Sequence, residues 1–139
     1  MPVQAELIQL SFDKIMQTRA YTVVVLGTTE KRFAIYTEPN VGRILQFYLT
    51  DTVKQRPLTH DLMDSILRGT SIRVRQVVIN DVQDTIYYAR LFIEQDAGEI
   101  RHILEIDARP SDCITLALLN NAPIYCTREV LEKTIAVED

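Results

Sequence analysis

Glycine and proline are scarce in this chain, with 4 and 5 among 139 residues. Their scarcity leaves little room for linkers or low-complexity tails. We therefore expect one domain over residues 1–139, a length typical of a single hydrophobic core. With 47% hydrophobic and 24% charged residues, the composition is that of an ordinary globular protein, which can build a core without disulfides or a structural metal.

Long apolar runs are also missing. The longest uncharged run, residues 113–127, contains two asparagines and a proline, and it is shorter than the roughly 20 apolar residues of a membrane span. The N-terminus lacks the basic segment and apolar stretch of a signal peptide. The two cysteines, Cys113 and Cys126, lie in apolar company, which predicts buried thiols rather than a disulfide. We expect a cytoplasmic protein that does not span a membrane.

Basic residues are fewer than acidic ones, 15 against 19, which gives a net charge of −4 and a pI near 5.2. This balance excludes a non-specific nucleic-acid coat protein, whose affinity depends on many Lys and Arg side chains. It leaves open an enzyme that holds a few phosphates locally. Arginine supplies 11 of the 15 basic residues. Its planar fork suits phosphate and carboxylate groups, although arginine also serves ordinary surface pairs.

Alternating and β-branched segments predict strands, joined by short polar turns. A turn at residues 80–84 ("NDVQD") and another at 95–98 ("QDAG") make the last three long strands an antiparallel meander. Adjacent Tyr87 and Tyr88 place one ring in the core and the other at the surface. The expected strands cover residues 3–12, 21–26, 32–37, 71–79, 85–94 and 99–106, with a short one at "APIYC" (122–126).

Helical spacing of apolar residues predicts the remaining elements. One helix opens at Pro39 or Asn40, a second runs from Thr59 to Gly69, a nearly all-apolar third begins near Pro110, and a last one is "TREVLEKT", capped by Thr127. In the second helix, Leu62, Met63, Ile66 and Leu67 line one face. The predicted fold class is α+β, one domain with a mixed or antiparallel sheet and three to four helices.

Catalytic signatures are absent: the chain has no Walker loop, GxGxxG, HExxH, CxxC or GxSxG. Two cysteines and two distant histidines supply no ready zinc cage. Two similar helix starts remain, "RPLTHD" from Arg56 and "RPSDCI" from Arg109. Each places an arginine and an aspartate ahead of an apolar run, so they are either helix-start residues used twice or two halves of one site.

In the first start, Thr59 is the expected N-cap, with Leu58 and Met63 placed for a hydrophobic staple. Asp61 then lies in the first turn, where the helix dipole favours a negative charge. His60 is less expected there. The dipole keeps its imidazole neutral, as a general base or a metal ligand requires, and an exposed histidine without a role is the alternative.

In the second start, Asp112 opens a buried helix. It is either an anion near the cap, paired with Arg109, or a residue that faces a cleft. The sequence leaves Arg109, Pro110 and Ser111 all open as the N-cap.

Arginines also recur on the meander strands, where they predict either a basic stripe or a salt-bridged face, the second being the more common outcome. The residues concerned are Arg73, Arg75, Arg90 and Arg101, with Glu94 and Glu105 as the neutralising carboxylates.

Three segments, "RPLTHDLMDSIL", "VVINDVQDTIYYARLFIE" and "LEIDARPSDCITLALLNNAPIY", resemble the bifunctional nuclease domain family, most closely over residues 56–130. The resemblance implies a small α+β homodimer, and some plant members of the family degrade both RNA and DNA. Arg56, Pro57, Thr59, His60 and Asp61 match the first motif, and Arg109, Pro110, Ser111 and Asp112 match the second. The chain departs from the family at Val41-Gly42, where a Glu-Ala pair is usual, although Glu38 lies just upstream.

Two functions follow as hypotheses. In the first, the protein hydrolyses phosphodiester bonds in RNA or DNA: His60 is the base, Arg109 and Arg56 neutralise phosphoryl charge, and Asp61 and Asp112 orient the base or hold Mg²⁺ or Mn²⁺. Thr59 and Ser111 complete the substrate contacts. In the second, the chain is a non-catalytic dimeric module that binds a partner or a small anionic ligand, as the acidic net charge and the replaced glutamate favour, and the Arg–Asp pairs only fix two helix starts.

Overall fold

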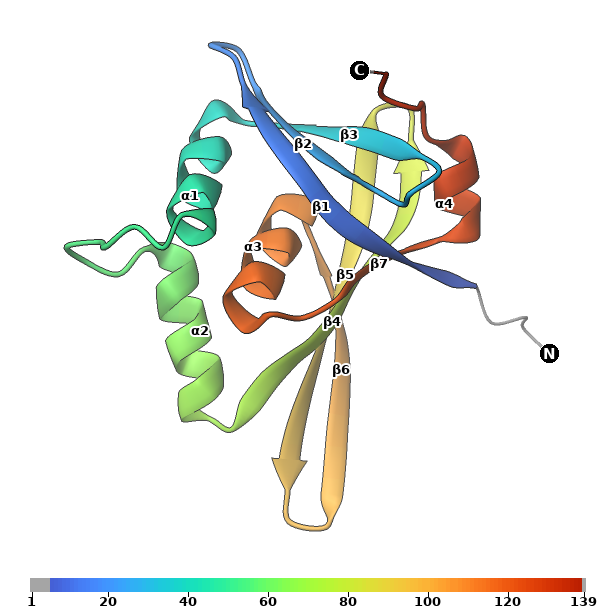
Figure 1. Cartoon of the computed structure of the whole chain (residues 1–139). Helices are drawn as coiled ribbons and strands as arrows, with labels where there is room; N and C mark the ends of the chain where they lie inside the picture. The colour runs from blue at the N-terminus through green and yellow to red at the C-terminus, as the bar shows by residue number, and fades with distance from the viewer. Residues whose placement is uncertain (1–5, 139) are drawn as a thin grey trace.

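Seven strands form one mixed sheet in the computed structural model, which describes residues 6–138 (Figure 1). The strands are β1 (Leu7–Gln17), β2 (Thr22–Gly27), β3 (Arg32–Thr37), β4 (Ile72–Gln83), β5 (Ile86–Ala97), β6 (Ile100–Ala108) and β7 (Ile124–Thr127). The helices are α1 (Pro39–Leu49), α2 (Thr59–Gly69), α3 (Pro110–Asn120) and α4 (Arg128–Lys133). The α+β class and the mixed sheet are as predicted.

Two antiparallel meanders make up most of the sheet, whose order is β3-β2-β1-β7-β4-β5-β6. The short strand β7 joins them: it pairs antiparallel with β1 and parallel with β4. The predicted β4–β5–β6 meander is therefore confirmed. Strand β1 begins at Leu7 and runs beyond the expected end to Gln17, while residues 3–5 of that prediction lie outside the described residues.

The predicted turn at "NDVQD" is wrong in position. Residues 80–83 continue β4, and the chain reverses one residue later, where Asp84 adopts a φ of +59°. A left-handed backbone suits an aspartate in a tight turn. Residues 80–83 are mostly polar although they belong to a strand, because β4 leaves the core near its end and its side chains become partly exposed.

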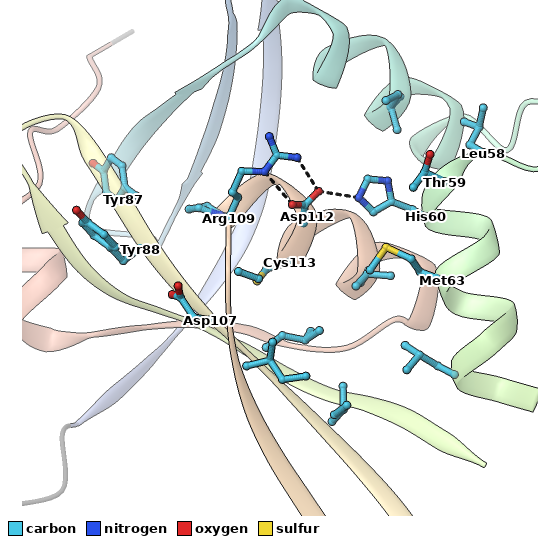
Figure 2. Close-up of a pocket in the computed structure, with 18 of the residues that line it drawn as sticks. Leu58, Thr59, His60, Met63, Tyr87, Tyr88, Asp107, Arg109, Asp112 and Cys113 are labelled. Carbon is cyan, nitrogen blue, oxygen red and sulfur yellow. Dashed lines mark hydrogen bonds and ion pairs between the residues drawn. The ribbon is translucent and has the colours of Figure 1, made fainter. Parts of the chain in front are cut away.

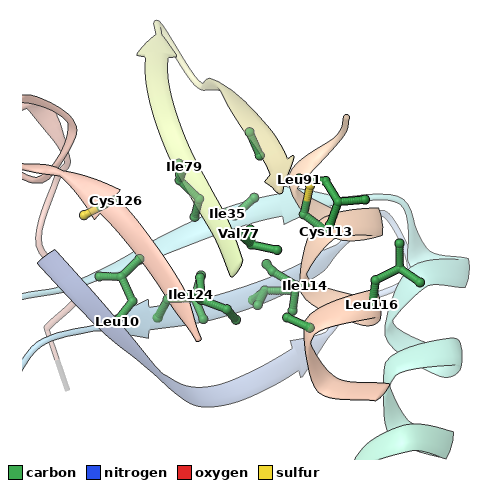
Figure 3. Packing of buried hydrophobic residues seen from close by; sticks show 14 of the residues in the cluster. Leu10, Ile35, Val77, Ile79, Leu91, Cys113, Ile114, Leu116, Ile124 and Cys126 are labelled. Atoms are coloured by element: carbon green, nitrogen blue, oxygen red, sulfur yellow. The ribbon is translucent and has the colours of Figure 1, made fainter. Parts of the chain in front are cut away.

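Helix α3 lies in the concave side of the twisted sheet, with α1 and α2 beside it (Figure 1). Its apolar residues face the sheet and the neighbouring helices, so Cys113, Ile114, Leu116 and Ala117 are all buried. They pack in one cluster with side chains from six strands, among them Leu10, Ile35, Val77, Ile79, Leu91 and Ile124 (Figure 3). The buried residues of α3 therefore form the centre of the core.

All four helices begin where the sequence predicts, and α2 also ends at the predicted Gly69. Helix α1 begins at Pro39, α3 begins at Pro110 with Arg109 as the N-cap, and Thr127 caps α4 by accepting a hydrogen bond from the Val130 N–H at 3.1 Å. The prediction that Thr59 caps α2 is wrong. Leu58 is the N-cap instead.

None of the helices in residues 6–138 has the length and apolarity that a bilayer crossing requires.

Both cysteines are buried free thiols, as predicted. Burial raises the pKa of Cys113 to about 12 and that of Cys126 to about 11. Neither thiol is therefore ionised near neutral pH, and both serve as core residues.

The arginines of the second meander form a salt-bridged face, the second of the two predicted outcomes. Glu94 accepts hydrogen bonds from Arg73 and ion-pairs with Arg75 and Arg101, and its side chain is fully covered. The hydrogen bond from Arg73 is the main cause that lowers the pKa of Glu94. These charges lie on the sheet face turned away from α3.

Gly42 explains the departure at Val41-Gly42. Its N–H donates to the buried Thr22 hydroxyl at 3.1 Å, which docks α1 on the start of β2. A Cβ at this position would clash with the Gln17 amide oxygen and lie 2.5 Å from Thr22 Oγ1. The absence of a side chain is thus what lets helix and strand approach.

We expect Gly42→Ala to lower the free energy of unfolding by about 1–3 kcal/mol, because overpacking against buried Thr22 outweighs the better helix propensity of alanine. Gly69→Ala is the matched control, since a Cβ at Gly69 meets no atom within 4 Å. Urea unfolding of both variants compares them directly. Equal stability of the two would contradict the close-packing explanation.

Candidate functional site

An open groove of about 1150 Å³ lies between α2, the N-terminal half of α3 and the β5–β6 hairpin (Figure 2). Its floor and walls are mostly apolar. The apolar residues that line it include Met63, Ile66, Leu91, Ile93, Ile106 and Leu116.

A chain of three polar side chains also lines this groove (Figure 2). His60 Nε2 lies 2.9 Å from Asp112 Oδ1. Arg109 donates to the same carboxylate, with Nε 2.9 Å from Oδ2 and Nη2 3.2 Å from Oδ1. The side chains of His60, Asp112 and Arg109 are 13%, 27% and 66% exposed, so the chain runs from the interior to solvent. The structure therefore brings the two helix starts together.

Helix geometry sets these positions. Pro110 occupies the first turn of α3, where its missing N–H costs nothing and its fixed φ suits the helix. Asp112 then projects from the first turn of a helix that the core holds firmly. On α2, the Asp61 carboxylate accepts the Leu58 N–H at 2.8 Å, which fixes the entry into the helix and turns His60 toward α3.

The Asp112 carboxylate is held as an anion. Burial alone would raise the pKa of Asp112, but hydrogen bonds from Arg109 and His60 outweigh it and bring the pKa below its ordinary value. An ionised carboxylate only accepts hydrogen bonds, so His60 must donate through Nε2–H. In its neutral form the imidazole therefore carries its lone pair on Nδ1, a buried atom without a hydrogen-bond partner among the described residues.

Arg109 presents the exposed end of the chain. The hydrogen bonds to Asp112 and the charge of that carboxylate raise the pKa of Arg109, and Glu38 adds a smaller electrostatic contribution. Glu38 is the residue just before α1, so the glutamate upstream of the replaced Glu-Ala pair does lie within electrostatic reach of the site.

The other predicted site residues are placed differently. Thr59 lines the groove, but Asp61 caps α2 and lies 3.6 Å from Lys54 Nζ. Arg56 is exposed and outside the groove lining. Ser111 is buried, and its carbonyl accepts the Thr115 hydroxyl at 2.8 Å.

Asp61 and Asp112, the two predicted metal ligands, have separate partners in the structure. Within residues 6–138, no group of three or more His, Cys, Asp or Glu side chains is arranged to hold a metal ion. The donor set around Asp112 consists of a histidine and an arginine, and the arginine repels a cation. These side chains do not fit a protein-held divalent ion.

Sequence reasoning missed most of the groove. The apolar face predicted for the helix at Thr59–Gly69 would ordinarily lie against a core, yet α2 has no buried residue, and Leu62 and Ile66 are each 56% exposed. Periodicity identifies an apolar face but not what covers it. The tyrosine prediction fared better: Tyr87 stacks on buried Phe33 with ring centroids 5.7 Å apart, Tyr88 is exposed, and both line the groove.

Comparison with known proteins identifies relatives for most of the chain. The model of the bifunctional nuclease domain matches residues 23–139. Two uncharacterized proteins of Mycobacterium tuberculosis, from two strains, are each 34% identical over 76 residues, or 55% of this chain. The matched region covers 42% of each of these relatives, so the chain spans less than half of their length.

The Asp112 contacts generate a pH-dependent prediction. We expect Asp112→Asn to lower the free energy of unfolding at about pH 7 by about 1–2 kcal/mol, because two charge-assisted hydrogen bonds are weakened. The lowered pKa means that this stabilisation is present above the unfolded-state value, about 3.9, and is lost as the pH falls through the folded-state pKa.

The stability difference between wild type and Asp112→Asn should therefore shrink steadily below about pH 4. Urea unfolding across this range measures it. A difference that stays constant down to about pH 2 would show that Asp112 is not held by these charges.

Proposed function

The chain belongs to the bifunctional nuclease domain family, and we propose that it hydrolyses phosphodiester bonds in RNA or DNA at the His60–Asp112–Arg109 chain of the groove. The observation that carries this proposal is the geometry of one carboxylate, Asp112. It orients an imidazole on one side and an exposed guanidinium on the other. A base and an anion-binding group are the two parts that metal-free phosphodiester hydrolysis needs.

Arg109 is the phosphate-binding group in this proposal. Two of its three nitrogens donate to Asp112, and the side chain is 66% exposed, so its remaining N–H groups are available to a phosphoryl oxygen. The first turns of α2 and α3 converge beside it and add the positive ends of two helix dipoles. Charge that develops on the phosphoryl oxygens is stabilised there.

His60 is the base, and Asp112 is its positioning residue. The hydrogen bond from Nε2–H to Asp112 leaves the lone pair on Nδ1. Nδ1 takes a proton from water as the water oxygen attacks phosphorus. The P–O bond to the leaving nucleoside then breaks, and the imidazolium returns its proton to that oxygen. Because Nδ1 is buried in the free protein, the imidazole must move toward the groove when substrate binds.

Mg²⁺ and Mn²⁺ have no step in this mechanism, since the side chains around Asp112 do not fit a held cation. Asp61 acts through the helix, by fixing the turn that carries His60. Arg56, Thr59 and Ser111 remain predicted substrate contacts, of which Thr59 lies in the groove lining. RNA or DNA as substrate, a homodimer and a cytoplasmic location remain proposals as well.

A binding module is the second candidate, and the apolar lining of the groove favours it. Most of the lining is aliphatic or aromatic, which suits a partner side chain or an amphiphile better than a polyanion. In that case the three polar side chains hold two helices together and anchor one anionic group of the ligand.

Cleavage of labelled single-stranded RNA and DNA tests the nuclease proposal, with Mg²⁺, Mn²⁺ or EDTA in parallel. We expect His60→Gln and Asp112→Asn to reduce the rate by about 10²-fold or more, the usual contribution of a positioned acid–base group. EDTA should leave the wild-type rate unchanged.

Asp13→Asn is the matched control, because Asp13 forms a comparable Asp–Arg pair with Arg32 at 2.9 Å outside the groove. It should cleave at the wild-type rate. Equal cleavage by all four proteins would place the activity elsewhere, and absence of cleavage by wild type would favour the binding module.

A further inference from the structure

Strand β6 is an open edge of the sheet. It pairs with β5 on one side, and no other described strand lies on its outer side. Residues 100–107 are all exposed, including Ile100, Ile103, Leu104 and Ile106 at 40% to 61%. A long exposed edge with four large apolar side chains and no proline offers its free N–H and C=O groups to another strand.

The opposite edge of the sheet differs. Strand β3 has two buried residues, and the C-terminal segment runs beside it, where the Val137 N–H donates to the Arg32 carbonyl at 2.8 Å. One edge is thus partly covered by the chain itself, whereas β6 is left bare.

Pairing with β5 shows which way the β6 side chains point. Leu104 and Ile106 lie opposite Ile93 and Leu91, two residues of the groove, so the even-numbered residues face the groove side. Ile103 lies opposite Glu94, and Arg101 ion-pairs with Glu94 at 2.7 Å, so the odd-numbered residues share the salt-bridged face.

The β6 sequence "IRHILEI", residues 100–106, is complementary to itself when reversed. We propose that two copies of this chain join through β6, antiparallel, about a two-fold axis at Ile103. Opposed residues then share a sheet face, as pairing requires. On the salt-bridged face, Arg101 lies opposite Glu105 of the second copy and Ile103 opposite its counterpart. On the groove side, Ile100 lies opposite Ile106 and His102 opposite Leu104.

Charge and apolar matching together select this register. Arg101 and Glu105 are 59% and 54% exposed at the edge, and the symmetry forms their ion pair twice. Two neighbouring registers also keep the same faces together. An axis at Leu104 would pair Arg101 with Asp107 but would place Ile103 opposite Glu105, and an axis at His102 would place Ile103 opposite Arg101. Within residues 100–106, only the axis at Ile103 pairs both charged residues with opposite charges and also pairs Ile103 with an apolar side chain.

The second copy would also extend the groove. Ile106 is part of the groove lining, and Ile100 of the second copy lies directly beside it on the same face. The β5–β6 turn of that copy then approaches Asp107 and Arg109. The interface thus gives the proposed homodimer a defined contact surface, and it does not depend on nuclease activity.

Analytical ultracentrifugation of full-length charge variants tests the interface. Wild type should sediment as a species of twice the 16.0 kDa chain mass. Arg101→Glu and Glu105→Arg should each weaken the dimer by about tenfold or more, because each places like charges opposite one another twice. The double variant should recover most of the wild-type affinity, because opposite charges face each other again.

Arg73→Glu is the matched control. Arg73 also bonds Glu94, but it lies on β4, two strands from the edge. It reproduces the folding cost of Arg101→Glu and should leave the dimer affinity near that of wild type. Failure of the double variant to recover, or equal weakening by Arg73→Glu, would overturn the charge pairing.

Cysteine crosslinking tests the register. Under oxidation, Ile103→Cys should form the covalent dimer much faster than Leu104→Cys, since residues at the axis lie about 5 Å apart and residues one step away are diagonal neighbours at about 7–8 Å. The native thiols are buried and do not compete. A monomeric wild type would overturn both the homodimer and its surface, whereas a dimer that crosslinks at neither position, or faster at Leu104→Cys, would overturn this interface alone.

Discussion

Burial of α3 is the constraint from which the rest of the structure follows. A helix that is apolar nearly all round has no side that can be exposed to solvent. The sheet therefore curls around α3, and α1 and α2 cover the part of it that the sheet does not. Only its ends reach the surface. The single charged residue of its first turn, Asp112, therefore stands at the boundary between core and groove, held in place by a helix that cannot easily move.

That position determines the chemistry of the site. A carboxylate anchored in this way accepts hydrogen bonds from nearby donors. Here it accepts them from His60 on α2 and from Arg109 at the start of its own helix. The same hydrogen bond joins two helices and fixes the tautomer of an imidazole, so one contact serves the fold and also the proposed chemistry. Both views of the helix starts therefore hold: the residues are ordinary for helix N-termini, and their convergence creates the site.

Local patterns predicted the elements well, because strand alternation and helical spacing arise from the chain's immediate neighbours. They also singled out His60, Arg109 and Asp112, which the structure brings together in one groove. They could not say that His60 and Asp112 meet across 52 positions of sequence, whereas Asp61, one residue away, turns back to cap its own helix. Nor could they foresee the groove, because an apolar stripe on α2 looks the same whether a core or an open cleft lies beside it.

In the proposed mechanism, Asp112 holds His60 with a lone pair on Nδ1 for use on a phosphodiester. Nitrogen-15 NMR of the His60 ring tests it most directly, during titration with a dinucleotide phosphorothioate. A protonated Nε2 in the free protein, with an Nδ1 resonance that shifts as ligand binds and no such shift in Arg109→Ala, is the predicted result. A proton on Nδ1 in the free protein, or a ring that does not respond to the ligand, would contradict this role of His60.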